Sequence, residues 1–207
     1  MRMTGAHRAA LHDLMRWRRD VRHFRPDPIP QDRLDRLRDA MDMAPSVGNS
    51  RPWRVLQVDS AAARAAVTVN FEAANAAAAR RYTDGRRAAY DALKLAGLRD
   101  APVHLAIFTA SDPAEGHGLG RQTMPQTLDF STVCAIHGLW LAARADNIGV
   151  GWVSILDPDA LYATLTAPPD WSLTAYLCLG LPARDDDTPL LHRTDWQADT
   201  PTTWRRV

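Results

Sequence analysis

This sequence of 207 residues has little of several features that would indicate a protein class. It contains one lysine, Lys94, and two cysteines, Cys134 and Cys178, which lie far apart in apolar runs. Such cysteines argue against a disulfide or thiolate metal site and favour a reducing compartment. Basic and acidic residues nearly cancel, at 25 against 24 with a net charge of +1. No overall field would therefore attract the chain to nucleic acid or to a membrane.

Long apolar runs are also missing. No stretch reaches the roughly 20 apolar residues that a membrane-spanning helix needs. The first fourteen residues carry scattered charges and no apolar core of signal-peptide length. A chain of this length fits one domain around one hydrophobic core. We therefore expect a single domain over residues 1–207, located in the cytoplasm.

Several binding and catalytic motifs are absent as well. Glycines 116, 118 and 120 lack the spacing of a dinucleotide-binding loop, and there is no P-loop. The seven histidines show no metal-ligand spacing, so we expect no metal site. Ser131 and Ser154 do not belong to a nucleophile elbow of the G-x-S-x-G type. No serine triad is therefore predicted.

Hydrophobic periodicity predicts alternating helices and strands. A first helix is expected to end near Val21, before three prolines, and a second to begin at Gln31 and end before Pro45. Residues 128–145 are apolar nearly all round, which predicts a central helix buried on every side. The predicted strands cover residues 53–58, 103–109, 150–155 and 173–179, and further helices cover 61–79 and 158–165.

A cluster of arginines lies at the end of the first predicted helix, at Arg18, Arg19 and Arg22. If the helix continues, Arg18 and Arg22 stand one turn apart, and their guanidinium groups could clamp one phosphate. Asp20 would then point away from Arg18 and be free for other chemistry, or it could pair with a neighbouring arginine. A solvated basic helix end is the alternative, and it is the commoner one when the cluster is taken alone.

Two glycine-containing segments are further candidates for a binding site. In the loop at residues 44–53, Gly48 allows close backbone approach and Trp53 offers a packing surface. In the second segment, Gly151 would let a flat ligand lie against the backbone, and Ser154 would give one hydrogen bond in a dry pocket. Each segment could also be an ordinary connection, with a core tryptophan in the first and a glycine bulge in the second.

Taken together, these segments resemble the FMN-binding nitroreductase superfamily. The resemblance rests on residues 18–24, the 44–53 loop and residues 151–154. More narrowly, the chain is similar to the 5,6-dimethylbenzimidazole synthase branch, and the similarity covers about residues 18–196. The segments that carry this narrower match are residues 93–95, 120–127, 131–136, 139–145 and 176–180.

The resemblance implies an α+β, nitroreductase-like fold, in which helices flank a central, mostly antiparallel sheet. It also implies an intertwined homodimer with two FMN sites at the subunit interface. The implied enzyme is an oxidoreductase that uses molecular oxygen to fragment reduced FMN. Its products would be 5,6-dimethylbenzimidazole, the lower ligand of vitamin B12 (cobalamin), and erythrose 4-phosphate. A separate flavin reductase would supply the reduced FMN.

Residue roles carry over by position. The resemblance implies catalytic roles for Asp20 and Ser154. Arg51 stands where the branch usually has glutamine, and a cation there could stabilise anionic reduced flavin or point elsewhere. The implied FMN-binding residues are Arg18, Arg19 and Arg22 at the phosphate, Ser46, Val47, Gly48, Arg51, Gly151 and Trp152 around the ring, and Lys94 in the lid region.

Two other functions fit parts of the pattern. An FMN-dependent NAD(P)H nitroreductase or flavin reductase would keep its flavin and pass hydride to an external acceptor, and the superfamily fold permits this. A non-catalytic flavin-binding module would explain the arginines but leave no task for Asp20. The presence of both Asp20 and Ser154, and the breadth of the narrower match, favour the synthase.

Overall fold

The computed structural model of the chain describes residues 1–93 and 97–207. Helices are interspersed with strands along it, together with two short 3-10 helices, η1 and η2. In chain order the elements are α1 (Gly5–Trp17), α2 (Gln31–Asp42), η1 (Val47–Asn49), β1 (Trp53–Gln57), α3 (Ala61–Ala79), α4 (Asp84–Asp91), β2 (Val103–Ala110), η2 (Glu115–Gly118), α5 (Thr127–Ala145), β3 (Gly149–Val153), α6 (Pro158–Leu165), β4 (Trp171–Gly180) and α7 (Leu190–Arg193).

A four-stranded sheet forms the centre of the fold, in the order β1-β2-β4-β3. Each neighbouring pair of strands is antiparallel, and the longest pairing joins β2 to β4, from Val103 opposite Leu179 to Ala110 opposite Trp171. All four strands predicted from apolar runs are confirmed, with ends displaced by at most two residues. The expected α+β class with a central antiparallel sheet is therefore confirmed.

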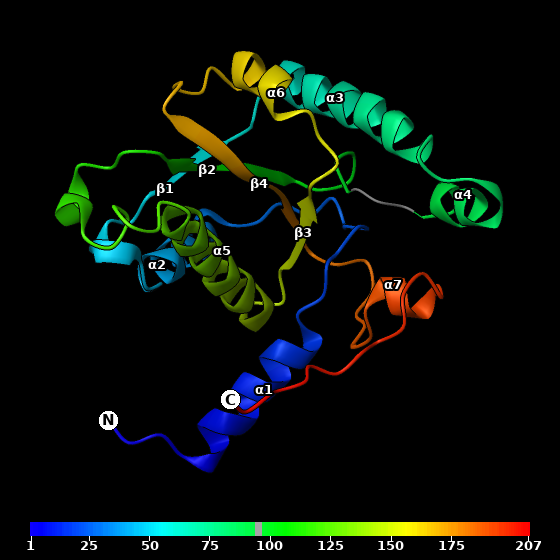
Figure 1. Cartoon of the computed structure of the whole chain (residues 1–207). Coiled ribbons are helices and arrows are strands. Elements are labelled where there is room, and N and C mark those ends of the chain that lie inside the picture. The colour runs from blue at the N-terminus through cyan, green and yellow to red at the C-terminus, as the bar shows by residue number, and fades with distance from the viewer. Residues whose placement is uncertain (94–96) are drawn as a thin grey trace.

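Helices cover both faces of the sheet (Figure 1). Successive residues of a strand point to opposite faces. Accordingly, Ile107 and Leu177 pack with side chains of α2 and α5, whereas Phe108 and Tyr176 pack with side chains of α3 and α6. All four side chains are fully buried. Each such side chain stabilises the fold by about 1.5–3 kcal/mol, so the two clusters hold the helices firmly on the sheet.

The central helix α5 is covered on one side only within this chain. Ile136 is fully buried and Leu139 nearly so, but Phe130 is 56% exposed and Val133 41% exposed. Cys134 and His137 are exposed on the same stripe. The prediction that this helix is buried on every side is therefore wrong for the single chain. Its all-round apolar character includes a face that no part of the described chain covers.

The first helix, α1, stands away from the core (Figure 1). None of its residues is buried, and Leu11 and Met15 are about half exposed, at 50% and 46%. Within the ranges that the structure describes, no helix is long and apolar enough to cross a membrane.

Candidate functional site

The arginine segment after α1 is extended, not helical. α1 ends at Trp17, and Arg18 has an extended backbone with φ −73° and ψ 105°. The Val21 N–H donates to the Val150 carbonyl at 3.0 Å, and Asp20 forms a parallel bridge with Val150 of β3. The prediction that the helix reaches Val21 is therefore wrong. Backbone pairing with β3 satisfies groups that the helix would otherwise have paired.

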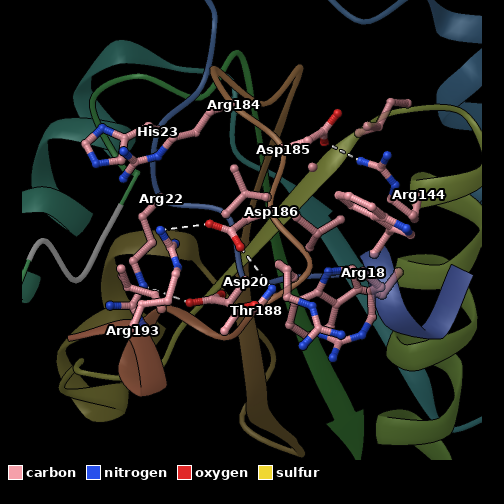
Figure 2. Close-up of a pocket in the computed structure, with 18 residues that line it drawn as sticks. Arg18, Asp20, Arg22, His23, Arg144, Arg184, Asp185, Asp186, Thr188 and Arg193 are labelled. Carbon is pink, nitrogen blue, oxygen red and sulfur yellow. Dashed lines mark hydrogen bonds and ion pairs between the residues drawn. The ribbon is translucent and has the colours of Figure 1, made fainter. Parts of the chain in front are cut away.

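The extended backbone brings Asp20 to Arg22. Alternate residues of an extended chain share a face, so Asp20 lies on the same face as Arg18 and Arg22. The predictions that Arg18 and Arg22 stand one helical turn apart and that Asp20 points away from Arg18 are therefore both wrong. Arg22 Nε donates to Asp20 Oδ2 at 2.8 Å (Figure 2). The backbone N–H of Trp152 donates to Asp20 Oδ1 at 2.9 Å. Both carboxylate oxygens are thus hydrogen-bonded, one to a cation and one to β3, which fixes their position.

Asp20 and the arginines line one wall of a pocket. Its other walls come from the end of α5, the start of β3 and the C-terminal segment 184–193 (Figure 2). Six arginines and three aspartates line it, so with His23 neutral the lining has an excess of three positive charges. These charged residues are Arg18, Arg19, Asp20, Arg22, Arg144, Arg184, Asp185, Asp186 and Arg193.

Two of these aspartates hold the C-terminal segment in place. Arg144 of α5 donates to Asp185 at 2.6 Å, and Arg193 of α7 pairs with Asp186 at 2.7 Å. Because Asp20 pairs with Arg22, every aspartate of the pocket is paired with an arginine. Three of its arginines have no carboxylate partner among the described residues and are available to an anion: Arg18, Arg19 and Arg184.

Arg18 and Arg19 are held by other means. The guanidinium carbon of Arg18 lies over the ring of Trp140, 4.6 Å from its centroid. Burial lowers the pKa of Arg18 from its ordinary value, repulsion by Arg19 adds to this, and attraction by Asp20 opposes it. Arg19 donates from Nη2 to the Met15 carbonyl at 2.8 Å, while its Nε is buried without a partner among the described residues. A buried donor without an acceptor fits a site that a bound anion completes.

Three arginines of the pocket were not predicted from the sequence as site residues: Arg144, Arg184 and Arg193. Arg144 was assigned only to the central helix, and the other two lie in a charged C-terminal stretch that carried no recognisable motif. Only the folding of distant segments onto one another places them beside Arg18.

The pocket is small. It encloses about 60 Å³, whereas pockets that enclose drug-sized ligands measure roughly 300–1,000 Å³. It has room for a small anionic group such as a phosphate but not for a flavin ring. This pocket alone therefore cannot enclose a whole flavin.

The loop of Ser46, Val47 and Gly48 lies far from this pocket in the same chain. Part of η1 packs against η2 and the N-terminal half of α5, where the Val47 N–H donates to Ser131 Oγ at 3.0 Å. The pocket lies at the opposite end of α5, beside Arg144. At 1.5 Å per residue, the helix between Ser131 and Arg144 spans about 20 Å. One chain does not bring these two predicted parts of the FMN site together.

Other predicted site residues lie in separate places. Arg51 belongs to the Ser46 loop: its N–H donates to Ser46 Oγ at 3.1 Å, and its guanidinium lies 3.8 Å from a carboxylate oxygen of Asp42. Ser154 is exposed and follows the end of β3, instead of lying within a strand as predicted. Lys94 lies outside the described residues.

Gly151 lies against the arginine segment of the same chain. A Cβ at this position would overlap with the Val21 carbonyl oxygen. The prediction that a flat ligand could lie against this face of Gly151 is therefore wrong, because the arginine segment occupies that space. Gly149 has the same neighbour, since a Cβ there would lie 2.8 Å from Val21 Cγ2. The two glycines allow the arginine segment to pair with β3.

Comparisons with known proteins agree with this fold. The model of the nitroreductase family matches residues 15–181. A 5,6-dimethylbenzimidazole synthase of Rhodobacter capsulatus is 60% identical over 206 residues and covers 100% of both chains. Another, of Rhodospirillum rubrum, is 50% identical over 194 residues and covers 94% of this chain and 92% of the relative. The crystal structure of an iodotyrosine deiodinase bound to FMN and 3-iodo-L-tyrosine shares the fold, with a TM-score of 0.72, 20% identity and coverage of 95% of this chain and 97% of that chain. The chain therefore belongs to the nitroreductase family.

Proposed function

We propose that this chain is a 5,6-dimethylbenzimidazole synthase, which uses molecular oxygen to break reduced FMN into 5,6-dimethylbenzimidazole and erythrose 4-phosphate. Relatives named for this activity match it at 50–60% identity over nearly its whole length. The observation that carries the proposal is the place of Asp20, between Arg22 and the backbone of β3. A carboxylate among phosphate-binding arginines weakens their attraction for an anion. Its presence there indicates a task other than binding.

The arginine pocket fits the phosphate of FMN. Guanidinium groups present paired N–H donors that match phosphate oxygens, and the excess positive charge of the lining suits a phosphate monoester with two negative charges. The predicted grip of Arg18, Arg19 and Arg22 therefore gains one candidate from the C-terminal segment, Arg184, which has no carboxylate partner among the described residues.

The chemistry is assigned to β3, whose first residues line the pocket and whose last residue precedes Ser154. Reduced FMN would supply the electrons that activate oxygen and would itself be consumed. Asp20 would move protons, because its carboxylate is held in a fixed position next to the strand. Ser154 lies two residues beyond Trp152, about 7 Å of extended chain, and would hydrogen-bond the ring.

A second copy of the chain would complete each site. The Ser46 loop and the arginine pocket lie at opposite ends of α5, and the face that contains Phe130 and Val133 is uncovered. If two α5 helices pack antiparallel through this face, the end of each helix that contacts the loop lies toward the pocket end of the other helix. A two-fold axis produces two such sites, which supports a homodimer with shared FMN sites.

Mixed dimers test this sharing. Arg22→Ala would impair the pocket, and Gly48→Val would impair the loop, because Gly48 has φ +56° and an added Cβ would lie 2.9 Å from the Leu119 carbonyl oxygen. At low FMN concentration each variant alone is expected to be inactive. Co-expressed, they should recover about a quarter of wild-type turnover, because half of the dimers would contain one unaltered site. If each site were contained within a single chain, co-expression of the two variants would recover no turnover.

The activity itself is tested with chemically reduced FMN. Protein and reduced FMN are combined without air, oxygen is admitted, and the products are separated by chromatography and identified by mass. We expect 5,6-dimethylbenzimidazole. Recovery of intact FMN alone would contradict the proposed reaction.

The electron source separates the synthase from a nitroreductase or flavin reductase. With FMN and NAD(P)H alone we expect neither oxidation of NAD(P)H nor product, and we expect product once a separate flavin reductase is added. Rapid oxidation of NAD(P)H by this protein alone, with its flavin retained, would favour the reductase.

A further inference from the structure

Trp140 is close to two functional parts of the site. It projects from α5 into the lining of the arginine pocket, and the Arg18 guanidinium lies over its ring. Its ring and that of Trp152 are 6.3 Å apart between centroids, at an interplanar angle of 44°. Trp152 in turn donates its backbone N–H to Asp20. Trp140 therefore touches both the arginine grip and the strand that holds the carboxylate.

The three grip arginines differ in what orients them. Asp20 accepts a hydrogen bond from Arg22, and the Met15 carbonyl accepts one from Arg19. No carboxylate among the described residues pairs with Arg18. Its guanidinium has the Trp140 ring as the contact that restricts its long and flexible side chain.

This contact leaves the Arg18 donors available. A guanidinium that lies over an aromatic ring is attracted by the negative face of that ring. This attraction does not use its N–H groups as hydrogen-bond donors, so they can still bind an anion. An ion pair with a carboxylate would instead use the two donors that a phosphate requires. Arg18 is also half-buried, so a bound anion displaces less water than it would at an exposed arginine.

We propose that Trp140 is a positioning residue of the phosphate site, whose ring holds the Arg18 guanidinium with its N–H donors available to the pocket. The identity of the anion as the phosphate of FMN rests on the proposed function. The role of Trp140 in anion binding does not depend on turnover.

The test compares FMN with riboflavin, which lacks the phosphate. Trp140→Leu should weaken FMN binding by roughly tenfold, equivalent to about 1.4 kcal/mol, and change riboflavin binding less than about twofold. Trp140→Phe, which keeps an aromatic face, should recover part of the FMN affinity. Trp204→Leu is the matched control, because Trp204 is 94% exposed and lies outside the pocket. Dissociation constants are measured by flavin fluorescence or calorimetry.

A double-mutant cycle separates positioning from general support of the fold. In an Arg18→Ala background, Trp140→Leu should cause little further loss of FMN affinity, because the residue that Trp140 positions is already gone. Independent, additive losses, or equal losses for FMN and riboflavin, would overturn the proposal. If Trp140→Leu does not fold, the same cycle with Trp140→Phe decides by the same criteria.

Binding of inorganic phosphate tests the role of Trp140 separately from the synthase reaction. Phosphate should compete with FMN at the wild-type pocket, and Trp140→Leu should weaken that competition. If this holds while no 5,6-dimethylbenzimidazole forms, the synthase assignment fails and the role of Trp140 stands. If the product forms but Trp140→Leu binds phosphate as the wild type does, the role of Trp140 fails.

Discussion

Asp20→Asn is expected to reduce formation of 5,6-dimethylbenzimidazole by at least about a hundredfold, while the dissociation constant for FMN changes by less than about tenfold, or 1.4 kcal/mol. The carboxylate accepts from the Trp152 N–H on one oxygen and from Arg22 on the other. Asparagine has one acceptor oxygen and an amide that only donates, so one of these donors loses its partner. It also cannot exchange a proton as a carboxylate does.

The effect on FMN affinity stays small because two consequences oppose each other. Removing a negative charge strengthens the attraction of the arginines for phosphate. Losing the hydrogen bond that orients Arg22 weakens it. Products are quantified by chromatography after single additions of reduced FMN, and binding is measured separately with oxidised FMN.

Asp187→Asn is the matched control for this substitution. Asp187 also pairs with an arginine, Arg16 at 2.6 Å, but it does not line the pocket. Its variant should form product as the wild type does. Equal product from Asp20→Asn and the wild type would remove Asp20 from the mechanism, and a large loss of FMN affinity would make it a binding residue instead.

Gly151→Ala is expected to lower the free energy of unfolding by about 3 kcal/mol, the upper part of the usual range for overpacking. The new methyl group would overlap with the Val21 carbonyl oxygen. Because that oxygen belongs to backbone, it cannot move aside as the end of a flexible side chain can. The arginine segment must then leave β3, and the hydrogen bond from Trp152 to Asp20 is lost with it. FMN binding should therefore weaken together with stability.

Thermal unfolding and FMN titration check this prediction. For a domain of this size, 3 kcal/mol corresponds to a fall in Tm of roughly 10 °C. Gly85→Ala is the control, because a Cβ at Gly85 meets nothing within 4 Å. That variant should stay within about 0.5 kcal/mol of the wild type. A Gly151→Ala protein with unchanged Tm and FMN affinity would show that the arginine segment does not rest on this glycine.

Most secondary structure followed from local sequence. The four strands were predictable because each is a short apolar run between turn residues. Helix α6 has the predicted bounds, 158–165, since Asp157 caps its first turn and Pro158 suits its first position. These signals act between residues that are close along the chain.

The end of α1 could not be predicted in this way. Residues 16–22 contain no glycine or proline, and arginine has good helix propensity. The helix ends because Val21 pairs with Val150, far along the chain. The same pairing changed the geometry of the site, since it set Asp20 beside Arg22 instead of opposite Arg18.

The sequence by itself determined that this chain has a cluster of arginines suited to an anion, an α+β order of elements and a resemblance to the nitroreductase superfamily. Only the tertiary structure decided that Asp20 bonds to both Arg22 and β3, and that Arg144, Arg184 and Arg193 join the pocket. It also decided that the Ser46 loop lies at the other end of α5. Residue chemistry and periodicity are local properties, whereas contacts between distant segments exist only once the sheet and its helices have packed together.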